Sequence, residues 1–103
     1  MTGRRTPLSH AALAGLAAAG WGYDGAKLAK TFVFRDFGEA FAFMSRCVPE
    51  IEERDHHPEW ANIYNKVTVH LTTHDAGGVT GKDGELARIM DTIAAEFLSK
   101  AEP

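Results

Sequence analysis

The chain has 103 residues, of which 45% are hydrophobic, and this size and composition suit one globular domain. The 11 basic and 14 acidic side chains give a net charge of −3, so nothing indicates a surface for nucleic acid or for an anionic membrane. The apolar stretch 11–19 is far shorter than the roughly 20 residues of a membrane-spanning helix. A single cysteine, Cys47, excludes an intramolecular disulfide. We expect one cytoplasmic domain over 1–103, with a flexible leader at 1–8.

The first third of the chain predicts a helix followed by a β-hairpin. A serine N-cap and a terminal glycine frame a helix over 10–19. A short strand at 21–23 and an alternating strand at 26–35 follow. The Asp24-Gly25 pair between them is a strong hairpin turn signal, because glycine tolerates the positive φ that such turns need.

A second, longer helix is expected to supply most of the core. Asp36 can cap it, with Glu39 three residues later, as in a capping box. Apolar residues then recur at spacings of 4, 3, 4 and 3, which predicts one buried face. These residues are Phe37, Phe41, Met44, Val48 and Ile51. Pro49 removes a backbone hydrogen bond, so we expect a kink near 45–49 or a helix that stops and restarts.

The second half of the chain predicts another hairpin and a third helix. The residues before and after an Asn65-Lys66 turn alternate as in strands. Thr80 with Asp83 three residues on can cap a last helix. The predicted order is α-β-β-α-β-β-α, a two-layer α+β fold with a four-stranded antiparallel sheet and three helices on one face. The other sheet face, or an edge strand, then favours a homodimer or homotetramer.

Three of the five histidines stand out by their positions. His56 and His57 are adjacent and are followed by the rigid Pro58, whereas His74 lies 18 residues after His56. The predicted hairpin brings His74 back toward the other two, and we expect all three imidazoles around one pocket. His10 and His70 are interpreted as ordinary surface residues.

Clustered imidazoles suit proton transfer near neutral pH, where one ring can act as acid and another as base. Three histidines could also form an open zinc site. Against zinc, the sequence has no helical His-x3-His pair, and Cys47 has no second thiolate nearby in sequence. Trp60 in the following strand could be packing or a flat wall for a planar ring.

These motifs resemble the pterin-4a-carbinolamine dehydratase family. The resemblance covers nearly the whole chain from about residue 13 and is most specific over the histidine segment. It includes Glu52, His56-His57-Pro58-Glu59-Trp60, Asn62, Tyr64, Thr73-His74 and Asp83. The resemblance implies removal of water from 4a-hydroxytetrahydropterin to give quinonoid dihydropterin, without metal or cofactor.

Site residues follow from the same resemblance. It implies His56, His57 and His74 as catalytic residues. The implied substrate-binding residues are Pro58, Trp60, Thr73, Asp75, Ala76 and Asp83. We assign His74 as the acid that acts on the 4a-hydroxyl, and His56 or His57 as the partner base.

Two alternatives remain open. Animal members of the family also act as dimerisation cofactors that bind a transcription factor, so the chain could be a binding module. It could also act on another pterin, including one connected with molybdopterin. The three histidines together favour the enzyme, because a pure binding module does not need them.

Overall fold

The computed structural model describes residues 6–101, and its element order is the α-β-β-α-β-β-α order that the sequence predicts. The elements are α1 (His10–Ala18), β1 (Gly22–Tyr23), β2 (Leu28–Val33), α2 (Phe37–Arg54), β3 (Glu59–Ile63), β4 (Lys66–Leu71), the short 3-10 helix η2 (His74–Ala76) and α3 (Gly81–Ala101).

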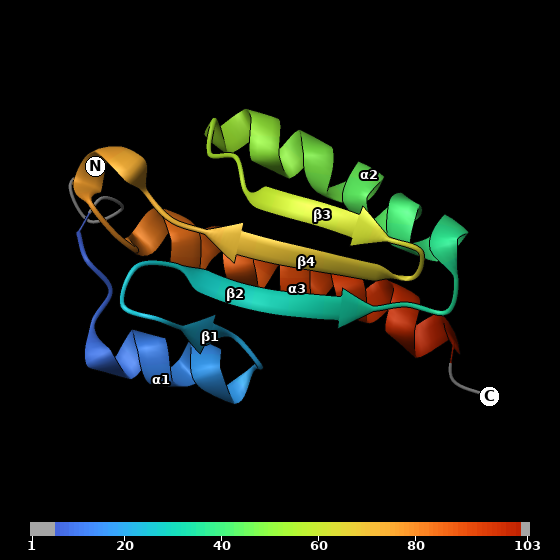
Figure 1. Ribbon diagram of the computed structural model, residues 1–103, viewed down its shortest axis with the longest axis horizontal. Helices are drawn as coiled ribbons and strands as arrows, with labels where there is room; N and C mark the ends of the chain where they lie inside the picture. Colours follow the sequence, from blue (N-terminus) through green and yellow to red (C-terminus); the bar gives the residue numbers. More distant parts are fainter. Residues whose placement is uncertain (1–5, 102–103) are drawn as a thin grey trace.

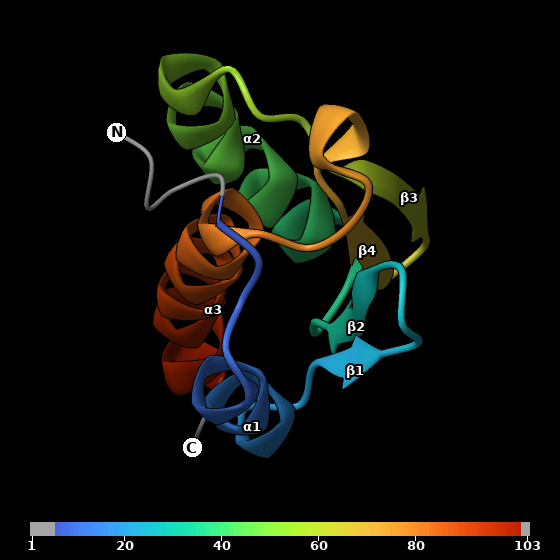
Figure 2. The same cartoon turned by 90° about the vertical axis from the view of Figure 1, so that its left-hand side faces the viewer.

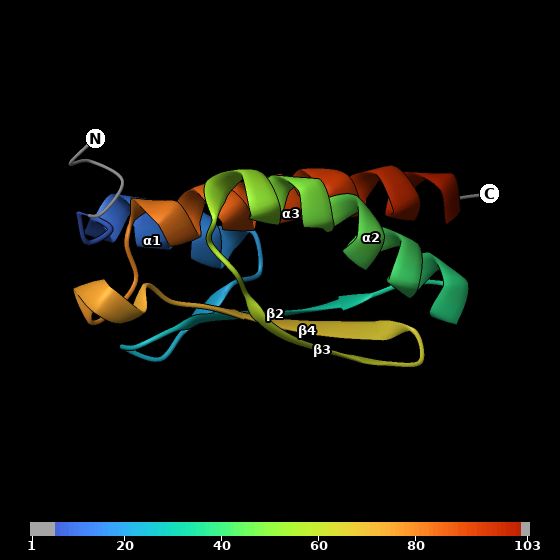
Figure 3. The ribbon, with the colours of Figure 1, turned by 90° about the horizontal axis from the view of Figure 1, so that it is seen from above.

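The four strands form one antiparallel sheet in the order β1-β2-β4-β3 (Figure 1). The three α-helices lie on the same face of this sheet, as views from the end and from above show (Figures 2 and 3). The register pairs Leu28 with Leu71 and Phe32 with Val67, so apolar side chains from neighbouring strands meet on the face toward the helices. The predicted two-layer α+β fold is therefore confirmed.

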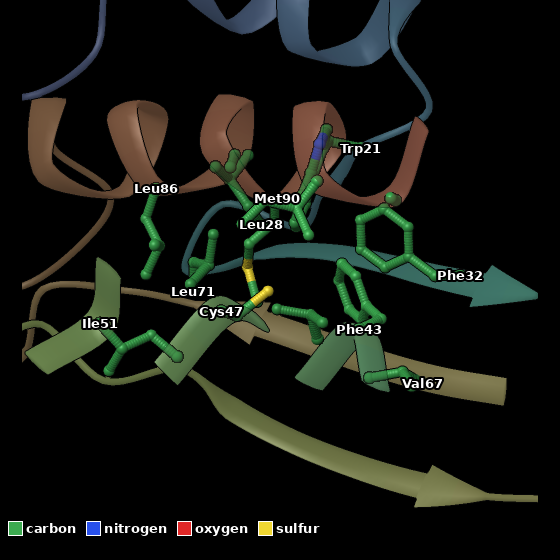
Figure 4. Close-up of a cluster of buried hydrophobic side chains, with 14 of the residues drawn as sticks. Trp21, Leu28, Phe32, Phe43, Cys47, Ile51, Val67, Leu71, Leu86 and Met90 are labelled. Carbon is green, nitrogen blue, oxygen red and sulfur yellow. The ribbon is translucent and has the colours of Figure 1, made fainter. Parts of the chain in front are cut away.

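The core lies between the sheet and the helices (Figure 4). Phe43 of α2 is fully buried and packs in a tilted arrangement against Phe32 and Phe34, with ring centroids 4.9 Å away in each case. Cys47, one turn later, is also fully buried. Burial raises the pKa of its thiol to about 12, so Cys47 acts as a small apolar core residue.

The predicted buried face of α2 is wrong for three of its five residues, whereas Ile51 is buried and Met44 packs against the core. Its buried stripe is Glu39, Ala40, Phe43, Cys47 and Ile51. Phe37, Phe41 and Val48, which were expected inside, are about half exposed and lie on a neighbouring stripe. Both stripes have helical spacing, so periodicity alone could not say which one meets the sheet. Pro49 does not interrupt α2, which is continuous over its 18 residues and bends along its length (Figure 3).

The turns also differ from the predicted ones. The β3–β4 turn is Tyr64-Asn65, one residue earlier than the expected Asn65-Lys66, and Tyr64 has a positive φ of 50°. The β1–β2 connection is four residues long, 24–27, because the side chain of Asp24 accepts hydrogen bonds from the backbone amides of Ala26 and Lys27.

The start of the described chain is tied to α3. The amide of Leu8 donates to the carbonyl of Val79, and the amide of Gly81 donates to the carbonyl of Thr6. The Leu8 side chain packs against the core and sits over Gly84, where an added Cβ would lie only 3.3 Å from it. Of the expected flexible leader at 1–8, residues 1–5 lie outside the described residues, whereas 6–8 are held by these contacts.

Candidate active site

A polar cavity of about 410 Å³ is lined by residues at the end of α2, in η2 and at the start of α3. These three parts of the chain lie at one end of the fold (Figures 1 and 2). The volume of the cavity is within the range of small-molecule sites. Eight residues line it: Asp55, His56, His57, Thr72, Thr73, His74, Asp75 and Lys82. All three predicted histidines are therefore at one cavity.

The β3–β4 hairpin brings the two histidine segments together. Residues 56–57 precede β3 and residue 74 follows β4, while the register pairs Glu59 with His70 at this end of the hairpin. Asp55 ends α2 in the left-handed conformation, with φ 49°, and so redirects the chain into the His56-His57 segment. The change of direction at Asp55 and the β3–β4 hairpin together bring imidazoles that are distant in sequence to one cavity.

His56 is the buried member of the three. Its Nε2 lies 2.6 Å from Oδ1 of Asp83, and the Asp83 side chain is completely buried. Burial alone would raise the pKa of Asp83, but hydrogen bonds from His56, Thr73 and the Thr80 amide outweigh it and hold the pKa below its usual value. Asp83 is therefore ionised and can only accept, so His56 donates from Nε2 and keeps Nδ1 as the nitrogen left for chemistry.

Asp83 also holds the start of α3. Its Oδ2 accepts from the Thr73 hydroxyl at 2.6 Å and from the Thr80 amide at 2.9 Å. The Thr73 hydroxyl has one proton, and it donates this proton to Asp83. The Thr80 hydroxyl, 2.8 Å away, must therefore be the donor to the Thr73 hydroxyl oxygen. The predicted cap and the predicted site residue are thus one side chain: Oδ2 caps the helix while Oδ1 orients His56.

The other two histidines pair with carboxylates on the rim. Nε2 of His57 lies 2.9 Å from Oε2 of Glu52, and Nε2 of His74 lies 3.3 Å from Oε2 of Glu59. These imidazoles are much more open than His56, with side chains 57% and 78% exposed. All three histidines therefore present Nε2 to a carboxylate.

The predicted site residues divide into three groups. The cavity is lined by His56, His57, Thr73, His74 and Asp75. Asp83 lies behind it and reaches it through His56. Pro58, Trp60 and Ala76 are not among its lining residues. Trp60 packs against the core and borders a separate hollow on the open sheet face, beside His70.

Sequence reasoning missed several residues at this site. Lys82, Asp55 and Thr72 line the cavity without having been predicted there. Each of the three is next in sequence to a predicted residue, so this adjacency was the available signal. Glu52 and Glu59 were part of the family pattern, but their pairing with particular imidazoles depends on the fold.

A second cavity, of about 400 Å³, lies between α2 and α3. It lacks histidines, and Arg46 and Arg54 on its walls are already paired with Glu96 and with Glu50 and Glu85. Within residues 6–101, no group of three histidine, cysteine or acidic side chains is arranged to hold a metal ion. Of these two cavities, the histidine cavity is the one whose lining carries imidazoles, the groups suited to proton transfer near neutral pH.

The fold and this cavity define a class: a small α+β protein in which paired imidazoles and carboxylates face a ligand-sized pocket. The sequence model of the pterin 4 alpha carbinolamine dehydratase family matches residues 6–93. The chain therefore belongs to the pterin-4-alpha-carbinolamine dehydratase family.

Relatives of known name agree with this assignment. A protein of Rhodopseudomonas palustris (strain BisB18), provisionally named a pterin-4-alpha-carbinolamine dehydratase, is 60% identical over 70 residues, which are 68% of this chain and 69% of the relative. A protein of Bradyrhizobium sp. (strain ORS 278) with the same name is 60% identical over 78 residues, which are 74% and 78% of the two chains.

A solved structure shares the fold. The transcriptional coactivator/pterin dehydratase from Brucella melitensis superposes with a TM-score of 0.77 at 41% identity, over 86% of this chain and 99% of its own. In addition, no helix within residues 6–101 combines the length and the apolar character needed to cross a membrane.

Proposed function

We propose that this protein removes water from 4a-hydroxytetrahydropterin to give quinonoid dihydropterin, by general acid–base catalysis without a metal. The observation that carries the proposal is the convergence of His56, His57 and His74 on one cavity, each with its own carboxylate partner. Membership of the family supports the same reaction class.

The reaction needs one proton delivered and one removed. The C4a–O bond breaks as an acid protonates the 4a-hydroxyl, which leaves as water, and the C4a=N5 double bond forms as a base takes the proton from N5. No electrons are exchanged with another molecule. General acid–base catalysis of this kind typically contributes about 10²–10⁴-fold.

We assign His74 as the acid and His56 as the favoured base, with His57 as the other candidate. His56 donates Nε2–H to a buried, ionised aspartate, an arrangement that leaves Nδ1 as the ring nitrogen that can accept a proton. His74 sits at the open rim, where released water can leave. In its protonated form, its Nδ1–H is the proton available to the leaving oxygen.

The substrate contacts remain part of the proposal. Thr73 and Asp75 line the cavity with the histidines, and Asp83 acts on the substrate only through His56. Pro58 would fix the course of the chain beside His57, and Ala76 belongs to η2 with His74. Trp60 would contribute by holding the start of β3 against the core.

The direct test follows the ultraviolet decay of freshly generated 4a-hydroxytetrahydropterin. We expect the native protein to accelerate the decay and His74→Ala to lose about 100-fold or more of that acceleration. His70→Ala is the matched control, because His70 lies on the open sheet face outside the cavity, and it should leave the rate unchanged. A native protein that does not accelerate the decay would refute the proposal.

We also propose a homodimer or homotetramer that acts in the cytoplasm. Large apolar side chains on α2, at the end of β3 and in the β3–β4 turn are exposed in the single chain. They include Phe37, Phe41, Val48, Ile63 and Tyr64. Sedimentation equilibrium should give a mass of at least twice 11.2 kDa, and a monomer at micromolar concentration would contradict this.

The same exposed residues favour the second candidate, a protein-binding module. The Brucella melitensis relative is described as a coactivator as well as a pterin dehydratase. A chain that binds a partner protein but shows no dehydratase activity in the assay above would support this alternative.

A further inference from the structure

His74 is the least supported imidazole of the candidate active site. It lies on η2, a helix of only three residues that is followed by Gly77 and Gly78, and its side chain is 78% exposed. Among residues 6–101 its one polar side-chain partner is Glu59, at 3.3 Å. A catalytic ring in such a position needs an external support if it is to hold one orientation.

Glu59 is itself held from the other side. Its Oε1 accepts a hydrogen bond from Nζ of Lys27 at 2.6 Å, while Oε2 faces His74. The hydrogen bond from Lys27 is the largest cause of a lowered pKa at Glu59, so this carboxylate is ionised at neutral pH. The two oxygens thus connect the β1–β2 turn, through the start of β3, to the η2 segment.

A second bond joins the same two segments. The Thr72 hydroxyl donates to the carbonyl of Ala26 at 3.0 Å, next to Lys27 in the turn. Asp24 fixes the form of this turn by accepting from the amides of Ala26 and Lys27, which themselves lower its pKa. The turn is therefore shaped in a way that presents Lys27 to Glu59.

We propose that Lys27 and Glu59 form a brace that positions His74 at the rim of the cavity. Both are positioning residues in the dehydration reaction, and in that sense the inference rests on the proposed function. Glu59 fixes Nε2 of His74, so that Nδ1 is the nitrogen offered to substrate. Lys27 restricts Glu59 to the rotamer that reaches His74.

The brace is distinct from a pair that stabilises the fold. Lys27 and Glu59 are both partly exposed, at 37% and 44%, and exposed ion pairs contribute little to folding. Loss of the brace should therefore change the orientation of His74 and the turnover rate, with little change in the free energy of unfolding. Misplacement of a catalytic group by about 1 Å can cost up to 10²-fold in rate, so a roughly tenfold loss in kcat is a reasonable expectation.

The first experiment measures the mobility of the His74 ring by NMR relaxation in the full chain, and it requires no activity. Glu59→Gln should increase ring mobility strongly and Lys27→Met should do so to a smaller degree. Glu53→Gln and Lys66→Met remove the same charges from exposed positions outside the cavity lining and should have no effect. An unchanged His74 ring in Glu59→Gln would overturn the brace, whatever the protein's activity.

The second experiment is a kinetic double-mutant cycle with the pterin substrate. Glu59→Gln should lower kcat about tenfold with little change in KM, but should have no further effect in a His74→Ala background. Exchange of the two residues, Lys27→Glu with Glu59→Lys, should fail to restore kcat, because the lysine at 59 cannot accept from His74. A restored rate, or an equal loss in the His74→Ala background, would overturn the proposal. If the native protein shows no dehydratase activity, the proposed function is refuted, and the NMR result alone then decides whether the brace exists.

Discussion

The candidate active site has two regions that use the same chemical pair in different environments. In the interior, His56 meets Asp83, and Asp83 also accepts from Thr73 and Thr80. On the rim, His57 and His74 meet Glu52 and Glu59 in side chains that are largely open to water. Water screens the rim pairs, whereas the interior pair cannot lose one partner without leaving a buried polar group unsatisfied. The comparison indicates that the interior pair is part of the fold and the rim pairs are adjustable.

The largest difference between the two regions should appear in folding stability. Asp83→Ala removes the acceptor of three buried hydrogen bonds at once, from His56, Thr73 and the Thr80 amide, and should lower the unfolding free energy by on the order of 3 kcal/mol. Glu52→Ala should leave the urea midpoint nearly unchanged, because its partner His57 is open to water. Equal losses in the two variants would show that the interior and rim pairs do not differ in this way.

Acid should weaken the interior pair of His56 and Asp83, whereas neutral pH should leave it intact. The pKa of Asp83 is lower in the folded chain than its reference value of 3.8, so its stabilising contribution is complete above that value. The contribution is lost as the pH falls below about 4 and through the folded-state pKa. The gap in unfolding free energy between the native protein and Asp83→Asn should therefore narrow between pH 5 and about pH 2, as urea titrations can measure. A gap that widens in acid would contradict an ionised Asp83.

Much of the fold was predictable because local signals and topology agree. The order of elements, the Asp36 cap and the α3 start all followed from residues within one or two turns of each other. The choice between the two apolar stripes of α2 was not predictable in this way. Phe41 and Phe43 are equally apolar, and only the sheet packed against the helix decides that Phe43 is inside. The positive φ of Tyr64 likewise has no signal in its residue type.

The candidate site was partly predictable for a related reason. A histidine pair followed by proline, and a third histidine after a hairpin, is a sequence pattern that a simple fold-back converts into one cavity. Which carboxylate serves which imidazole depends on side-chain reach across separate elements. Glu59 follows His57 by two residues, yet it meets His74. The ionised state of Asp83 needs three hydrogen bonds that come from two other segments of the chain.

If His56, His57 and His74 surround one pterin-sized cavity, a pterin bound there should contact all three rings. The direct measurement is a titration of the native protein with a stable 7,8-dihydropterin, followed through the ring signals of all five histidines by NMR. The signals of those three should move together with one binding constant, while His10 and His70 remain unchanged as internal controls. Shifts confined to His10 or His70, or no shift at a saturating ligand concentration, would contradict the assignment of this cavity as the active site.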